Sequence, residues 1–296
     1  MKPVKRMLVF VLCLCLLGSA GSAFAAVVKS GEARAVIGAN LTEEQIDTVY
    51  TIFGVSRGDV TELSVTNAEE REYLEGYVDS SLIGTNSISC VYIEVLPAGE
   101  GLQIETENLT WCTKEMYVNA LVTAGIDDAK IIVAAPFGVS GTAALTGIYK
   151  AYEDITGEEI DELAKLTGTQ ELVVTGELAD MIGNYDALEI VNELKLILDE
   201  TKLMSDEELT ETIRSIADEY NVSLSDKQLD QLIKLCRSLE KMNSDELKQK
   251  VEEVQQTVKK LSEAQEKVSG IVQTFRDIVQ KVTDFIERII SIFKKN

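Results

Sequence analysis

The stretch Lys130-Ile-Ile-Val-Ala-Ala135, followed by Pro136-Phe-Gly-Val-Ser-Gly141, decides the fold class of this 296-residue chain. The first six residues form a short, mostly apolar run, which is typical of a strand buried on both faces of a sheet. The proline and glycines that follow predict a loop, and residues 142–155 then show a helical pattern. A buried strand that leads directly into a helix indicates that helices and a sheet share one core.

The sequence on the N-terminal side of this stretch mixes strand and helix patterns. Thr42 and Gln45 form a capping box, which predicts a helix start. Residues 87–96 and 102–109 have strand patterns on either side of a turn, so we expect them to form a β-hairpin. The other expected elements are a strand at 60–66 and helices at 67–78 and 114–124. We therefore expect residues 26–157 to form an α/β (or α+β) domain with a small mixed sheet.

Strand signals fade after Gly157, and residues 158–242 are expected to form an all-α region. Capping boxes at Ser205 and Ser225, each with Glu or Gln three residues later, predict two of its helices. Residues 171–175 fit either a helix or a short strand.

The chain after residue 243 has the clearest periodicity. Apolar residues recur at alternating steps of three and four between residues 251 and 293, and only Gln265 breaks the register. This pattern predicts a long amphipathic, coiled-coil-like helix at 243–296. So wide an apolar face must be covered by its own protein, by a second copy or another envelope partner, or by a membrane surface. The residues expected to form its interaction face are Val272, Phe275, Val279, Val282, Ile286, Ile289 and Phe293.

Residues 1–25 have the pattern of a cleavable signal peptide. Three basic residues precede an apolar run from Met7 to Leu17, and Ala23-Phe-Ala25 matches a cleavage site. The apolar run is shorter than a membrane-spanning helix requires. We expect cleavage after Ala25 and a secreted or extracytoplasmic protein, with an uncleaved N-terminal anchor as the alternative.

The chain is strongly acidic and contains no histidine. Its 28 basic and 50 acidic residues give a net charge of −22, which repels nucleic acid, so no such partner is expected. The missing histidine excludes Ser-His-Asp triads, Cys-His pairs and histidine-ligated zinc sites. No sequence motif for a metal or cofactor is present, so neither is predicted. Pairs of carboxylates remain as catalytic groups.

Three cysteines remain after the expected cleavage: Cys90, Cys112 and Cys236. Cys90 and Cys112 would face each other across the predicted hairpin, which suggests a disulfide. Alternatively, all three are small buried hydrophobic residues.

The loop before the helix at 142–155 is the candidate ligand site of the sequence. Backbone N–H groups at a helix N-terminus can hold an anion, and two hydroxyl groups lie beside them here. The residues of this predicted site are Gly138, Ser140, Gly141 and Thr142. The alternative is an ordinary loop whose glycines let the helix pack closely on the sheet.

Several stretches resemble the YpuA-like family of predicted secreted proteins, a domain of unknown function. They are Ile37-Gly-Ala-Asn-Leu-Thr42, Thr66-Asn-Ala-Glu-Glu-Arg71, Thr110-Trp111 with Tyr117-Val-Asn-Ala-Leu-Val-Thr-Ala-Gly-Ile126, and the most specific, Val133 to Gly147. The resemblance covers residues 36–155 and continues more weakly to about residue 242. It implies an extracytoplasmic role and carries no catalytic residue.

These observations favour a secreted or cell-envelope protein that acts by binding or assembly through residues 251–293. Two alternatives stay open: a histidine-free hydrolase of envelope polymers that uses carboxylates, and an acidic protein that binds cations.

Overall fold

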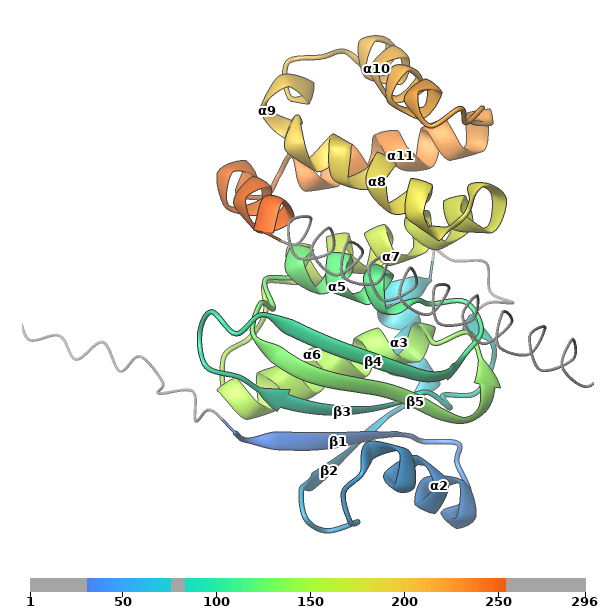
Figure 1. The fold of residues 1–296 in the computed structure, drawn as a ribbon, viewed down its shortest axis with the longest axis vertical. Coiled ribbons are helices and arrows are strands. Elements are labelled where there is room, and N and C mark those ends of the chain that lie inside the picture. Colours follow the sequence, from blue (N-terminus) through green and yellow to red (C-terminus); the bar gives the residue numbers. More distant parts are fainter. Residues whose placement is uncertain (1–30, 76–82, 254–296) are drawn as a thin grey trace, which may run out of the picture.

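A computed structural model describes residues 31–75 and 83–253, and its centre is a five-stranded mixed sheet (Figure 1). The strands are β1 (Ala33–Gly38), β2 (Thr61–Val65), β3 (Cys90–Val95), β4 (Leu102–Leu109) and β5 (Ala129–Val139), in the spatial order β2-β1-β3-β5-β4. β1 pairs with β2 and β4 pairs with β5 in parallel, whereas β3 runs antiparallel to both β1 and β5. This mixed sheet confirms the α/β (or α+β) class expected for the N-terminal part of the chain. The long helix predicted at 243–296 is described only over residues 244–253, and its remainder lies outside the described residues.

Helices cover the two faces of the sheet unequally. α5 (Lys114–Thr123) and α6 (Thr142–Thr156) pack on one face, where they bury Val91, Ile131 and Val133. The shorter α3 (Asn67–Leu74) lies against α6. α2 (Glu43–Phe53) packs on the opposite face over Ala35, Tyr92 and Ile132. Because side chains alternate along a strand, each central strand contributes to both cores.

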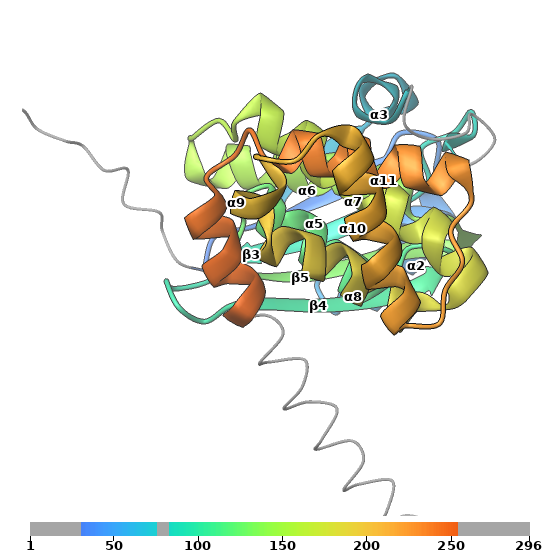
Figure 2. The ribbon, with the colours of Figure 1, turned by 90° about the horizontal axis from the view of Figure 1, so that it is seen from above.

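The remaining helices form a second layer beyond α5 (Figures 1 and 2). They are α7 (Glu162–Ile182), α8 (Asn184–Leu196), α9 (Leu198–Thr201), α10 (Asp206–Glu219) and α11 (Asp226–Leu239), and residues 244–253 are also helical. α7 contacts α5 on one side and α8 and α11 on the other. Gly168 allows this close approach, since a Cβ atom there would lie 2.5 Å from the Ala120 carbonyl oxygen.

A buried ion pair lies where the two layers meet. Lys195 Nζ of α8 lies 2.5 Å from Glu171 Oε1 of α7, and both side chains are fully buried. The Thr123 hydroxyl of α5 donates to Glu171 Oε2 at 2.5 Å. Burial raises the pKa of Glu171 and lowers that of Lys195, because it penalises both charged forms. The ion pair and the hydrogen bond from Thr123 link α5, α7 and α8. Removal of either charged partner would leave the other buried without a counter-charge and would destabilise this contact.

Most helix starts agree with the sequence analysis. Capping boxes form at Thr42, Ser205 and Ser225, each with its predicted partner three residues later. The helix predicted at 67–78 begins at Asn67, and Thr66 is its N-cap residue. Residues 171–175 belong to α7, which is one helix of 21 residues.

The predicted β-hairpin is wrong. β3 and β4 follow each other in sequence, but β5 lies between them in the sheet. The predicted loop 136–141 is also partly wrong, since β5 continues to Val139. Pro136 is tolerated there because the pairing of β5 with β3 has already ended at Ala134. The predicted signal peptide and the interaction face from Val272 to Phe293 lie outside the described residues.

Candidate functional site

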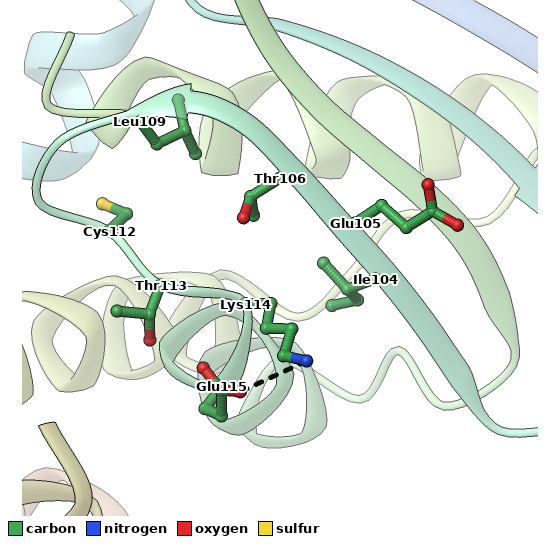
Figure 3. Close-up of a pocket in the computed structure, with 8 residues that line it drawn as sticks. All are labelled: Ile104, Glu105, Thr106, Leu109, Cys112, Thr113, Lys114 and Glu115. Atoms are coloured by element: carbon green, nitrogen blue, oxygen red, sulfur yellow. Dashed lines mark ion pairs between the residues drawn. The ribbon is translucent and has the colours of Figure 1, made fainter. Parts of the chain in front are cut away.

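A shallow, open groove of about 580 Å³ lies between the edge of β4 and the first turn of α5 (Figure 3). Its lining residues are Ile104, Glu105, Thr106, Leu109, Cys112, Thr113, Lys114 and Glu115. Figure 3 shows Ile104 and Thr106 on the side of β4 that faces α5, whereas Glu105 points to the other side. The groove therefore has an apolar strand wall opposite a polar helix wall.

β4 forms one edge of the sheet, and among the described strands it pairs only with β5. Gln103, Glu105 and Glu107 are exposed, while the alternate residues from Leu102 to Thr106 are half-buried. Exposed charges of this kind keep an edge strand from pairing with copies of itself. The outward backbone N–H and C=O groups of such an edge can still pair with an extended chain of a partner.

The first turn of α5 fixes the polar wall of the groove. The Thr113 hydroxyl accepts a hydrogen bond from the Met116 backbone N–H at 3.3 Å and so caps the helix. Lys114 Nζ lies 3.6 Å from Glu115 Oε1, and both side chains remain accessible. This wall therefore offers a partner one cationic and one anionic group within a single helical turn.

Cys112 lines the groove but is not a reactive group. Burial raises the pKa of its thiol to about 12. The thiolate is the nucleophilic form, and at neutral pH almost none is present. The groove therefore offers no cysteine nucleophile.

The residues of the predicted anion site lie at the end of β5 and the start of α6, and a carboxylate of the protein itself contacts one of them. Gly141 precedes α6 with φ of 100° and supplies no side-chain cap. Thr142 is only 1% exposed, and its hydroxyl donates to Glu70 Oε1 at 2.8 Å. Ser140 Oγ lies 3.3 Å from Thr142 Oγ1. Gly138 lies one residue before the end of β5. The Thr142 hydroxyl group, which the sequence analysis placed in the anion site, therefore already has Glu70 as its partner.

Glu70 has a perturbed pKa of the kind found at functional sites, and the residue is not predicted by the sequence analysis. It lies on α3 and is 1% exposed, and burial raises the pKa of its carboxyl group to about 7. A carboxyl group with such a pKa suits acid–base chemistry, but this one is closed off from substrate. No local signal marks Glu70, because it is one of two consecutive glutamates in an acidic helix and its partner is 72 residues away.

The geometry on which the predicted disulfide rested is absent. Cys90 packs beside α2, whereas Cys112 packs beside α5 on the opposite face of the sheet. Both residues, together with Cys236, are free and buried thiols. The other prediction, that the cysteines are small buried hydrophobic residues, is confirmed.

Within residues 31–75 and 83–253, the acidic side chains do not gather into a group of three or more that could ligate a metal ion. In the same ranges, no helix combines the length and apolar character needed to cross a membrane.

Comparisons with known proteins place the chain in a family. The family model described as "Protein of unknown function (DUF1002)" matches residues 37–261. The chain is 39% identical over 216 residues to "Uncharacterized protein YpuA" of Bacillus subtilis (strain 168), which covers 73% of this chain and 74% of that protein. No solved structure matches the chain. The family match runs from the end of β1 past α11 and includes the β4–α5 groove, and this chain belongs to the DUF1002 family of proteins of unknown function.

Proposed function

We propose that this protein is exported and acts at or outside the cell envelope as a binding protein rather than an enzyme. The observation that carries the proposal is the open groove along the edge of β4. Edge strands beside a groove bind extended segments, because backbone pairing supplies affinity while side-chain pockets supply selectivity. Export is supported by the signal-peptide pattern of residues 1–25.

The proposed partner is an extended polypeptide that carries basic groups. Glu105 and Glu115 line the groove, and the chain as a whole has a net charge of −22. Complementary charge raises the association rate and selects against acidic partners. Ile104 and Leu109 supply the apolar contact that fixes the register of the bound segment.

The C-terminal segment supplies a second surface in this proposal. Residues 251–293 carry the apolar stripe that self-association, envelope attachment or binding to a membrane surface would cover. The protein thus combines a groove on its folded body with a C-terminal segment suited to attachment or assembly.

The hydrolase alternative has less support. The carboxyl group with a raised pKa belongs to Glu70, which is 1% exposed and out of reach of a polymer. The described residues likewise give the cation-binding alternative no cluster of acidic ligands.

Fractionation of producing cells tests the proposal. The full chain, a chain ending at Glu253 and the full chain with Thr106→Arg are compared for their distribution between envelope and medium. Thr106→Val keeps the shape of the groove, and Thr48→Arg adds the same charge on α2, on the opposite face of the sheet.

We expect the full chain to be retained by the envelope, and we expect both the truncation and Thr106→Arg to shift it to the medium. The two control variants should behave as the full chain does. A chain found in the cytoplasm, or equal distribution of all five proteins, would contradict the proposal.

A further inference from the structure

The β4–α5 groove lies close to the point where the described chain ends. Lys250 Nζ forms an ion pair with Asp127 Oδ2 at 2.8 Å, in the connection between α5 and β5. The next residue, Asp128, accepts a hydrogen bond from the Gly101 backbone N–H at 2.7 Å. Gly101 directly precedes β4, so the last described turn of the chain is tied to the start of the groove strand.

The chain that follows is long enough to cover the groove. From Ile104 to Leu109, β4 spans about 17 Å at the usual rise of a strand. The 43 residues from 254 to 296 would span about 64 Å as a helix, so less than half of them covers this distance. Val251 is already buried, which shows that the apolar stripe makes contact with the body before the described residues end.

The charges of the two parts are opposite. Residues 254–296 contain eight basic and five acidic residues, a net charge of +3, whereas residues 26–253 contain 17 basic and 45 acidic residues. The basic side chains of the segment would meet Glu115 on the helix wall of the groove, whereas Glu105 points to the other side of β4. Covering an exposed edge strand with a helix is also a common way in which proteins prevent unwanted strand pairing.

We propose that residues 254–296 dock in the β4–α5 groove of the same molecule and cover it in the free protein. The apolar stripe of the segment packs on Ile104 and Leu109, and its basic residues face Glu115. The docking itself does not depend on the proposed function. The consequence of docking does rest on the proposed function. Attachment of the segment elsewhere would uncover the groove for a partner, so attachment of the segment and binding of the partner would be coupled.

Amide hydrogen exchange on the purified mature protein tests this inference. Exchange of residues 102–115 is compared between the full chain and a chain ending at Glu253, with α2 as the internal reference. We expect exchange in this range to be at least about tenfold faster in the truncated chain, with α2 unchanged. A synthetic peptide of residues 254–296 should restore the protection, and Thr106→Arg in the full chain should abolish it while Thr106→Val does not.

Equal exchange of residues 102–115 in the full and truncated chains would overturn the inference. Protection that grows with protein concentration, together with a dimeric mass, would assign the occupant to a second copy and would also overturn docking within one molecule. Equal exchange or a dimeric mass would leave the proposed function standing if the full chain still fractionated with the envelope. If the full chain were not retained by the envelope but residues 102–115 were still protected from exchange, the proposed function alone would be overturned.

Discussion

The Thr142 hydroxyl donates a hydrogen bond to the Glu70 carboxylate at 2.8 Å, and this contact joins α3 to the start of α6. The hydroxyl group that the sequence analysis assigned to an anion site therefore binds a carboxylate of the protein itself. Burial raises the pKa of Glu70 to about 7, so the contact depends on pH in the physiological range.

The first prediction concerns the pH dependence of stability. The folded-state pKa of Glu70 lies above its ordinary value of 4.5, so its contribution is fully present below pH 4.5 and is lost as the pH rises through 7. The free energy of unfolding should fall by about 2–3 kcal/mol over this window through Glu70. Glu70→Gln should remove that part of the slope. Urea unfolding of both proteins from pH 4.5 to 8 measures the difference, and parallel curves would contradict the assignment.

The second prediction concerns the buried ion pair of Glu171 and Lys195. Lys195→Met should lower the free energy of unfolding by about 3–5 kcal/mol, because it leaves a carboxylate buried without a counter-charge. Adding Glu171→Leu should recover much of that loss. Denaturant titration of the two single variants and the double variant measures the coupling. Additive effects would show that the two side chains do not interact.

The sequence predicts those features of the fold that depend on residues close together in the chain, and it predicts poorly those that depend on residues far apart. Thr42, Ser205 and Ser225 were found as helix caps because a capping box involves residues only three positions apart. The β3–β4 hairpin was wrong because strand pairing also depends on segments far along the chain. β5 is apolar enough to be buried on both faces and takes the inner position, while β4 alternates with exposed charges and suits an edge.

The same limit applies to the candidate site. The groove exists because β5 separates β3 from β4 and leaves β4 at the edge beside α5, an arrangement that no short stretch of sequence encodes. Ser140 and Thr142 were correctly placed at a helix start, since that pattern is local. Glu70 was missed because its partner lies 72 residues away.

The third prediction concerns the contact of α7 with α5. Gly168→Ala should lower the free energy of unfolding by about 1–3 kcal/mol, because the new methyl group would meet the Ala120 carbonyl oxygen. Gly147→Ala, in the middle of α6, is the matched control, since the new atom there would lie 3.3 Å from the side chain of Val36. Thermal unfolding should rank Gly168→Ala well below Gly147→Ala, and the reverse order would contradict the described packing.

The fourth prediction concerns the thiols of the mature chain. Cys90, Cys112 and Cys236 are buried and free, so a maleimide reagent should label none of them in the native protein within minutes. In denaturant without reductant, all three should be labelled. Mass spectrometry counts the added groups. A single labelled thiol in denaturant would instead reveal a disulfide.

Photo-crosslinking from the groove in producing cells tests the central claim most directly. A photoreactive residue replaces Thr106 in the full chain, and Thr48 on α2 is the matched control position on the opposite face of the sheet. The account predicts an adduct with a second polypeptide from position 106 and none from position 48. The absence of an adduct with a second polypeptide from position 106, or the same adducts from both positions, would contradict a binding role for the groove.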